Sequence, residues 1–446
     1  MPDLSPIRSV AIVGGGLAGC ECARLLARAG IAVTLHEMKP TRFSPAHSLE
    51  GLAELVCSNS LRSDDIDSGV GLLKQEMREL GSLTMEAATA TQVPAGKALA
   101  VDRDLFSAHI TAAIAAEPNI TVLRHEVTAI DAAELTADRT VIAAGPLASD
   151  ALSASLATAV GATHLYFYDA IAPIIAADSV DMSIAFWGSR YGEPGEDGDY
   201  LNCPMNEEEY RTFYQALVGA EKVPAHNFEK ERHFEGCMPI EALAERGDRT
   251  LVFGPFKPVG FTDPRTGQRP YAIVQLRMEN RNRTTFNLVG CQTKLKYGEQ
   301  ERVFRLIPGL ANAEFVRHGS MHRNTYVNAP LVLTEDLSLR RHPSIHLAGQ
   351  ITGVEGYVES AACGLWVGHV LAARAAGREL PLPPVETALG ALLGHLRTPV
   401  KNFQPSNVTF GLMPELGLRI KKRERKPIYS QRGREAFAAW RVAAGL

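Results

Sequence analysis

Residues 10–37 read VAIVGGGLAGCECARLLARAGIAVTLHE, and this stretch decides the fold class. A short apolar run at 10–13 is followed by three glycines and by a helical pattern that ends at Gly30. A second apolar run follows and ends at Glu37. Strand, helix and strand in this order form a βαβ unit, so the sequence predicts an α/β fold with a doubly wound, Rossmann-like parallel sheet.

The glycines between the first strand and the helix have the spacing of a dinucleotide-binding turn. In such a turn the first glycine permits a sharp bend, the second lets the backbone approach a pyrophosphate, and the third lets the helix pack on the strand. The N-terminus of the helix then binds the anion. The predicted cofactor contacts here are Gly14, Gly15, Gly16, Leu17, Ala18 and Gly19.

Glu37 supports the same prediction. It ends the second strand, 18 residues beyond Gly19, where a carboxylate accepts a hydrogen bond from a ribose hydroxyl. A glycine-rich turn that only packs a helix on a strand would not need this acid. The sequence therefore favours a bound nucleotide over a purely structural turn.

Length and composition indicate a globular protein of more than one domain. The chain has 446 residues, with 46 Lys and Arg, 50 Asp and Glu, a net charge of −4 and 46% hydrophobic residues. This excludes disordered, collagen-like and small disulfide-stabilised proteins, and about 150 residues per domain suggests two or three domains. No apolar run reaches the roughly 18 residues of a membrane span, and the N-terminus lacks signal-peptide features. We expect a cytoplasmic protein without membrane contact.

The character of the chain changes twice along its length. Strand and helix patterns alternate up to the apolar run that ends before Gly145, whereas the region from about 163 to 321 is richer in strands, loops and arginines. The alternating pattern returns at Ile345. We therefore expect a nucleotide-binding domain in two parts, 1–162 and 322–446, interrupted by an inserted α+β substrate domain, 163–321.

Residues 345–376, IHLAGQITGVEGYVESAACGLWVGHVLAARAA, contain a second strand, glycine turn and helix. This arrangement resembles the second cofactor-contact region of flavoproteins of the glutathione-reductase type, which a simple NAD-binding domain does not need. The resemblance implies that the dinucleotide is FAD. The positive end of the helix would lie near the flavin pyrimidine ring and favour an anionic reduced flavin.

Two of the seven cysteines stand in settings that suggest chemistry. No cysteine pair has zinc-site spacing, so neither a metal site nor disulfides are expected. Cys57 ends an apolar run, which leaves a core thiol and a reactive thiol both open. Cys237 lies between a glycine and a Met-Pro turn and is a candidate nucleophile. The three aspartates within 64–67 are expected to cap a helix that begins near Gly69, rather than to bind a metal.

Seven segments together resemble one known family: GGGLAG (14–19), HEMKP (36–40), AELVCSNSLRSDD (53–65), FEGCMPIE (234–241), GPFKPVGFTDPRTGQRPYAIVQLR (254–277), MHRNTYVNAP (321–330) and LAGQITGVEGYVES (347–360). The family is that of the folate- and FAD-dependent tRNA (uracil-5-)-methyltransferases, relatives of the GidA-type tRNA-modifying flavoproteins. The similarity runs nearly from end to end. It implies methylation of the T-loop uridine, position 54 of tRNA, with 5,10-methylenetetrahydrofolate as one-carbon donor and NADH or NADPH as the reductant of FAD.

The chemistry of this reaction suits the residues of the chain. Uracil C5 is a poor nucleophile until a thiolate adds at C6, and a carbon delivered at the aldehyde oxidation level needs a hydride to become a methyl group, which a reduced flavin supplies. The resemblance implies that Cys57 and Cys237 are the reactive pair. One would attack C6 and the other would act as acid or base, or hold its partner in place; we favour Cys237 as the nucleophile.

Further site residues follow from the resemblance alone. His322 would stack on the folate ring, with a hydrogen-bonded loop histidine as the alternative. Arg323, Lys294 and Lys296 would meet the glutamate carboxylates of the folate, with a solvated basic surface as the alternative. The implied flavin contacts are Gly145, Gly349, Gln350 and Ile351.

The C-terminal region is basic although the whole chain is mildly acidic. Residues 419–441 contain nine Lys and Arg and only two acids. Lys421, Lys422 and Arg423 would contact RNA phosphates, and Tyr429 and Trp440 would stack on unpaired bases. A solvated charged surface is the alternative interpretation.

Three rival functions remain open. The same chemistry could act on ribosomal RNA, or a GidA-like enzyme could modify the wobble uridine, although such proteins are usually longer. A flavin-bound RNA-binding protein without catalysis would tolerate the loss of both cysteines. A monomer is the expectation for the oligomeric state.

Overall fold

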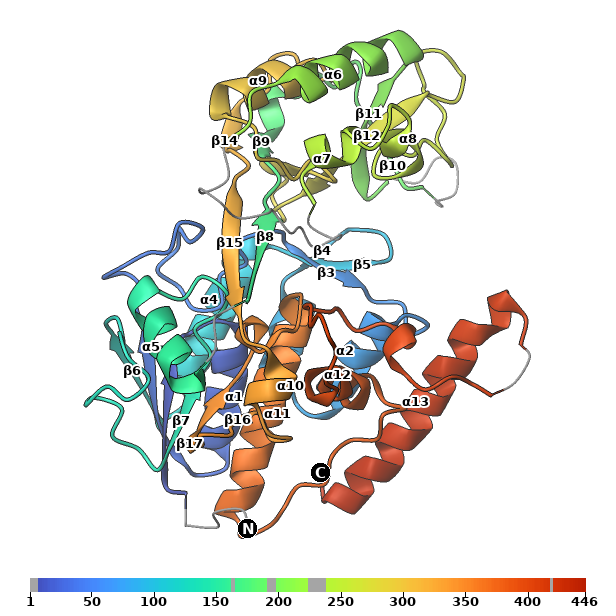
Figure 1. The fold of residues 1–446 in the computed structure, drawn as a ribbon. Coiled ribbons are helices and arrows are strands. Elements are labelled where there is room, and N and C mark those ends of the chain that lie inside the picture. Colours follow the sequence, from blue (N-terminus) through green and yellow to red (C-terminus); the bar gives the residue numbers. More distant parts are fainter. Residues whose placement is uncertain (1–6, 162–164, 191–197, 224–237, 418–419) are drawn as a thin grey trace.

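Two separate hydrophobic cores organise the chain (Figure 1). The computed structural model describes residues 7–161, 165–190, 198–223, 238–417 and 420–446. One core draws its buried side chains from residues 7–156 and 326–444, and the other draws them from residues 175–313. Distant parts of the chain therefore form the first core, and an internal segment forms the second.

The first core contains a six-stranded sheet with the order β16-β17-β7-β1-β2-β6. Four neighbouring pairs are parallel, and only the edge pair β16–β17 is antiparallel. The central strand is almost entirely buried, as is usual where helices cover both faces of a parallel sheet. The predicted doubly wound fold is confirmed. The strands are β1 (Ser9–Val13), β2 (Ala32–Glu37), β6 (Ile120–Arg124), β7 (Arg139–Ile142), β16 (Ser338–Leu339) and β17 (His342–Leu347).

Two helices of this unit pack unusually closely against each other. They are α1 (Leu17–Arg28) and α11 (Tyr357–Ala375). A Cβ on Gly364 of α11 would lie 2.0 Å from the carbonyl oxygen of Ala18, and one on Gly368 would lie 3.4 Å from the Cα of Cys22. The missing side chains therefore let the two helix backbones touch.

Further helices and a small antiparallel sheet, β3-β5-β4, complete the first unit. α2 begins at Gly69 as expected, but its cap is Ser68, whose Oγ accepts from the Gly71 N–H at 3.1 Å. The expectation of aspartate caps is wrong, because Asp64 instead binds Arg78 at 2.8 Å. The elements are β3 (Ser60–Ser63), β4 (Gln92–Val93), β5 (Ala98–Val101), α2 (Gly69–Glu79), α3 (Leu83–Ala90), α4 (Arg103–Ala115), α5 (Asp150–Val160), α10 (Ala329–Val332), α12 (Ala388–Arg397) and α13 (Lys422–Ala444).

The second core lies between an antiparallel sheet, β10-β11-β12-β13-β9-β14, and its helices. Its strands are β9 (Ile174–Ala176), β10 (Phe186–Gly188), β11 (Tyr200–Met205), β12 (Ala272–Met278), β13 (Thr285–Leu288) and β14 (Phe315–Arg317). Its helices are α6 (Glu207–Gly219), α7 (Ile240–Ala244), α8 (Thr250–Phe253) and α9 (Tyr297–Phe304). α6 starts with a capping box between Asn206 and Glu209.

A two-stranded antiparallel ladder connects the two units (Figure 1). It consists of β8 (Leu165–Ala170) and β15 (Met321–Tyr326), with His322 opposite Asp169. We propose that the inserted domain is the part of the chain that begins at β8 and ends at β15, with boundaries near residues 163 and 321. Within the described ranges, no helix combines the length and the apolar character needed to cross a membrane.

The helix contact yields a stability prediction. Gly364→Val places a branched side chain against the backbone of Ala18, so we expect a loss of about 1–3 kcal/mol in the free energy of unfolding and a loss of bound flavin. Gly394→Ala is the matched control, since a Cβ there meets only the Val385 side chain at 4.0 Å. Chemical unfolding and flavin absorbance measure both effects. Equal stability and flavin content in the two variants would contradict the close contact.

Candidate active site

The turn between β1 and α1 forms one wall of a pocket at the carboxyl ends of the sheet strands. Gly14 has a φ of +106°, and a Cβ there would lie 2.5 Å from the Ala143 carbonyl oxygen. A Cβ on Gly19 would lie 1.9 Å from the Gly14 carbonyl oxygen. No side chain caps α1 at Gly16, so N–H groups of its first turn stay available to an anion. This is the geometry that the glycine spacing predicts.

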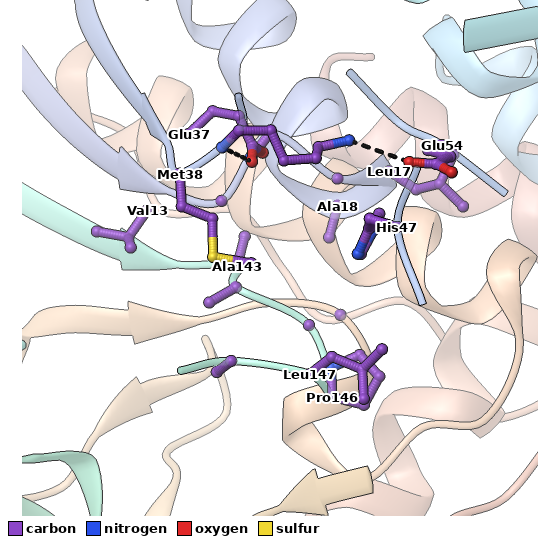
Figure 2. Close-up of a pocket in the computed structure, with 18 of the residues that line it drawn as sticks. Val13, Leu17, Ala18, Glu37, Met38, His47, Glu54, Ala143, Pro146 and Leu147 are labelled. Atoms are coloured by element: carbon purple, nitrogen blue, oxygen red, sulfur yellow. Dashed lines mark hydrogen bonds and ion pairs between the residues drawn. The ribbon is translucent and has the colours of Figure 1, made fainter. Parts of the chain in front are cut away.

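Glu37 closes the same turn from the end of β2 (Figure 2). Its Oε2 accepts from the Gly15 N–H at 2.8 Å, and its Oε1 accepts from the Lys39 N–H at 2.9 Å. The residue is buried. A carboxylate has more lone pairs than these two bonds use, so Glu37 keeps the capacity to accept from a ribose hydroxyl.

The loops after β7 and β17 form the opposite wall. Gly349 has a φ of +82°, and a Cβ there would lie 3.0 Å from the Cβ of Ala18. The predicted contacts that line the pocket are Gly14, Gly15, Gly16, Leu17, Ala18, Glu37, Gly145, Gly349 and Gln350. Gly19 lies behind the turn, and the Ile351 side chain is buried while its carbonyl oxygen accepts from the Val327 N–H at 2.9 Å.

The pocket fits a dinucleotide. Its uncapped helix N-terminus suits a pyrophosphate, and the buried carboxylate at the end of β2 suits a ribose. A Cβ added to Gly16 would meet no atom within 4 Å, so the backbone there faces open space. These features belong to the residues themselves and support the FAD that the sequence implies.

Sequence reasoning missed a buried ion pair that also lines the pocket. Lys39 Nζ donates to the Gly51 carbonyl oxygen at 2.7 Å and lies 3.5 Å from Glu54 Oε2. Figure 2 shows Glu54 and His47 together, on the far side of the pocket from Met38. Burial and the charge of Lys39 lower the pKa of His47. Nothing local in the HEMKP and AELVC segments indicates that they meet, since the contact is tertiary.

Cys57 follows Val56, which lines this pocket, although Cys57 itself is not among the lining residues. The Cys57 N–H donates to the Tyr357 hydroxyl oxygen at 2.7 Å, and the Ser58 N–H donates to the same oxygen at 3.3 Å. Tyr357 itself lines the pocket as the first residue of α11. Burial and the neighbouring Cys57 raise the pKa of its phenol, which keeps the hydroxyl protonated. The thiol loop, residues 55–59 around Cys57, is thus fixed to the start of α11.

A buried cluster of Arg103, Arg277 and Glu279 holds the residues on both sides of Cys57. Arg103 donates to the Leu55 carbonyl oxygen and lies 2.8 Å from Glu279 Oε2. Arg277 Nη2 donates to Ser58 Oγ at 2.7 Å. Two guanidinium groups and one carboxylate give the cluster a net positive charge.

The other described cysteines are in a different environment. All five are buried, and burial raises the pKa of each of their thiols: Cys20, Cys22, Cys203, Cys291 and Cys363. Only Cys57, among the cysteines the structure describes, is partly exposed. Cys237 lies outside the described residues. The described part of the chain contains no group of three or more His, Cys, Asp or Glu that could hold a metal.

The residues implied for folate lie on the ladder between the two units. His322 is half-buried in β15, and its Nε2 lies 2.9 Å from Ser320 Oγ. Burial, with the charge of Arg317, lowers the pKa of His322 to about 4, so the imidazole is neutral at neutral pH. The side chain of Arg323 lies outside the described residues.

The basic C-terminal segment covers most of α13, and Lys421, Lys422 and Arg423 stand at the N-terminal end of this helix. Lys421 is exposed, and the Arg423 side chain is 81% exposed, with its Nε 3.4 Å from Glu424 Oε1. The Lys422 side chain lies outside the described residues. This end of the helix therefore presents cations to solvent.

Two aromatic residues of this helix, Tyr429 and Trp440, already have partners within the protein. Trp440 is buried, and its Nε1 donates to the Pro381 carbonyl oxygen at 2.9 Å. Tyr429 is half-buried, and its ring already stacks on Phe410 with 5.2 Å between centroids. The prediction that Trp440 stacks on RNA bases is wrong, because the ring instead anchors the helix to the first core. The sequence could not distinguish these uses of an aromatic side chain.

Comparisons with known proteins cover nearly the whole chain. The model of the family described as GIDA, glucose inhibited division protein A, matches residues 9–379. The methylenetetrahydrofolate--tRNA-(uracil-5-)-methyltransferase TrmFO of Nitratidesulfovibrio vulgaris, strain Hildenborough, is 76% identical over 445 residues, 100% of this chain and 94% of that protein. The TrmFO of Lawsonia intracellularis is 61% identical over 435 residues, 97% of this chain and 98% of that protein.

Among solved structures, GidA of Aquifex aeolicus shares the fold. Its form II crystal structure aligns with a TM-score of 0.68 at 17% sequence identity, over 97% of this chain and 73% of that chain. At this identity the likeness concerns the fold alone.

Proposed function

The chain belongs to the methylenetetrahydrofolate–tRNA-(uracil-5-)-methyltransferases of the GidA family, and from this premise we propose that it methylates C5 of uridine 54 in the T-loop of tRNA. The observation that carries the proposal is the setting of Cys57. Its thiol is partly exposed, and its neighbour Val56 lines the dinucleotide pocket. Tyr357 of that pocket binds its backbone N–H, and a cluster with net positive charge holds the residues on both sides. A nucleotide-binding protein without chemistry would not need this arrangement.

FAD is the cofactor that the pocket would hold. The β1–α1 turn would bind its pyrophosphate, Glu37 its ribose, and Gly349 and Gln350 its flavin end. Ile351 is a further proposed contact next to them. When bound and reduced by NADH or NADPH, FAD supplies the hydride that converts the one-carbon unit of 5,10-methylenetetrahydrofolate into a methyl group.

The cysteines act on the uracil ring. We assign the nucleophile to Cys237, whose thiolate forms a bond from Sγ to C6 and so makes C5 nucleophilic. After C5 has taken up the carbon, a base removes the C5 proton and the folate-derived carrier leaves. The hydride then completes the methyl group, and the C6–Sγ bond breaks to return the thiolate. We assign the proton transfer to Cys57, which the contacts with Tyr357 and the neighbouring arginines hold in one position.

His322 and Arg323 would bind the folate. A neutral imidazole offers a flat ring for stacking on the pterin, and the lowered pKa of His322 keeps the ring neutral at working pH. Arg323 suits the glutamate carboxylates, because a guanidinium pairs with a carboxylate through two parallel hydrogen bonds. Both residues stand on β15, which runs from the inserted domain back to the first core.

The basic end of α13 would bind tRNA phosphates through Lys421, Lys422 and Arg423. Lys421 and Arg423 are exposed, and exposed cations release counterions when they meet a polyanion, which favours binding. We further propose that the protein acts as a monomer and that, as a tRNA-modifying enzyme, it works in the cytoplasm.

The cysteine assignment predicts two different losses. With tRNA that carries 5-fluorouracil at the target position, Cys237→Ala should form no covalent protein–RNA adduct, because no thiolate attacks C6. Cys57→Ala should still form the adduct but make no 5-methyluridine from normal tRNA, with flavin retained. Denaturing gels and nucleoside mass spectrometry measure the two outcomes.

The matched control is Cys203→Ala, since Cys203 is buried in the second core. It should keep both adduct and product. Wild-type rates of methylation in the Cys57 and Cys237 variants would refute the proposed function, and the reverse pattern of adducts would exchange the two roles.

The α13 assignment predicts an electrostatic effect. Lys421→Glu combined with Arg423→Glu should weaken tRNA binding and lower the slope of log affinity against log salt by about one unit for each lost phosphate contact. Arg434→Glu is the matched control, because it is exposed on the same helix about 17 Å along the axis from Arg423. Fluorescence anisotropy over a salt series measures both. Equal slopes for the two variants would remove this end of the helix from the interface.

A further inference from the structure

The ring of Phe253 is exposed on the surface of the inserted domain, although two nearby phenylalanines in the same segment are buried. Phe253, at the end of α8, is 69% exposed, whereas Phe256 and Phe261 are 0% and 6% exposed. All three belong to one short segment that leads into β12. The burial of Phe256 and Phe261 anchors this segment, and the exposed ring of Phe253 contributes nothing to the core.

Cations surround this ring. The guanidinium of Arg249 lies over the Phe253 ring, 4.9 Å from its centroid. Lys257 and Arg269 line the same groove as Arg249 and Phe253. None of these three cations forms an ion pair with a described residue. The groove therefore combines an aromatic face with three cations that form no ion pair within the described part of the chain.

The acidic side chains of the groove are already engaged. Asp263 binds Arg265, with 2.8 Å between Oδ2 and Nη2. Glu207 binds Arg211 at 2.7 Å, and Glu209 Oε2 accepts from the N–H of Asn206 at 2.7 Å as part of the helix cap. Glu209 keeps its negative charge in the groove, but none of the three acids is paired with Arg249, Lys257 or Arg269 in the described residues, so these cations outnumber the one acid without an ion pair.

The groove is preformed by backbone hydrogen bonds. The Asp263 N–H donates to the Gln268 carbonyl oxygen at 2.8 Å, which closes the loop that carries Arg269. The Tyr271 N–H donates to the Met205 carbonyl oxygen at 2.9 Å and fixes the loop to β11. A ligand would therefore find the ring and the cations in place, with little ordering cost.

We propose that the Phe253 surface, defined as Arg249, Phe253, Lys257 and Arg269, binds an unpaired segment of tRNA away from the target uridine. The ring stacks on a base, and the cations bind the flanking phosphates. Every base has a π-face, so a ring flanked by cations is the typical platform for single-stranded nucleic acid. An acidic peptide would use the charges but not the ring.

The position of the surface agrees with this role. Figure 1 shows α8 on the right-hand side of the inserted domain, and the basic N-terminal end of α13 lies on the same side of the molecule. An extended RNA could reach both. The inference rests on the proposed function for the identity of the RNA, but the surface would bind RNA whether or not the cysteines methylate it.

The test compares binding to three RNAs by fluorescence anisotropy with the full-length protein: tRNA lacking 5-methyluridine, a single-stranded oligonucleotide and a duplex of the same length. Phe253→Ala should weaken binding of tRNA and of the single strand about tenfold, because one stacked base is lost, and should leave duplex binding unchanged. Phe253→Tyr should restore binding, since a phenol ring stacks equally well.

A second variant and a control separate the contribution of the positive charges to RNA binding from that of base stacking. Arg249→Gln with Lys257→Gln and Arg269→Gln should weaken binding of all three RNAs and lower the salt slope by about two to three units. Val316→Ala, which is 61% exposed in the same domain, should bind like the wild type. Tight tRNA binding by Phe253→Ala, within twofold of the wild type, would overturn the proposal.

A failure of this RNA-binding proposal can be distinguished from a failure of the proposed methyltransferase function. If the wild type makes 5-methyluridine and Phe253→Ala binds tRNA normally, the methyltransferase proposal stands and the Phe253 surface is refuted. If the wild type makes no 5-methyluridine but single-strand binding depends on Phe253, the surface stands and the methyltransferase proposal fails.

Discussion

The contact between the backbones of α1 and α11 is the constraint on which the site depends. It exists because Gly364 has no side chain where the carbonyl of Ala18 passes. The contact brings the start of both helices to one pocket, and Tyr357, the first residue of α11, thereby reaches the backbone of Cys57. Because protein interiors are close-packed, a methyl group added at Gly364 would push the two helices apart. Both the pocket walls and the loop that carries Cys57 would then shift.

The inserted domain completes the site instead of merely covering it. Arg277 of β12 binds the side chains of Ser58 and Asn59, and Asn59 Nδ2 donates to the Met278 carbonyl oxygen at 2.8 Å. The buried pair of Arg103 and Glu279 joins the same two units. A thiol loop held from both sides has little freedom, and acid–base chemistry needs that precision of placement.

The sequence predicts what depends on local pattern. The glycine spacing near Gly14 and the alternation of strands and helices specify the parallel sheet and the dinucleotide turn, because each is built from neighbouring residues. Contacts between residues that are distant in the sequence cannot be predicted from local pattern. Tyr357 binds the backbone of Cys57 across 300 positions, and the Lys39–Glu54 ion pair becomes apparent only in the folded structure. Local pattern also misleads where tertiary packing decides, as with the Ser68 cap and with Trp440, whose ring is needed in the core.

The most direct test of the account follows one carbon atom. The purified protein would be incubated with tRNA lacking 5-methyluridine, NADPH and methylenetetrahydrofolate labelled in its methylene carbon, without S-adenosylmethionine, and the nucleosides analysed by mass spectrometry. The account predicts labelled 5-methyluridine at position 54 and nowhere else. Unlabelled or absent 5-methyluridine, or label in the wobble uridine or in ribosomal RNA supplied in parallel, would contradict it.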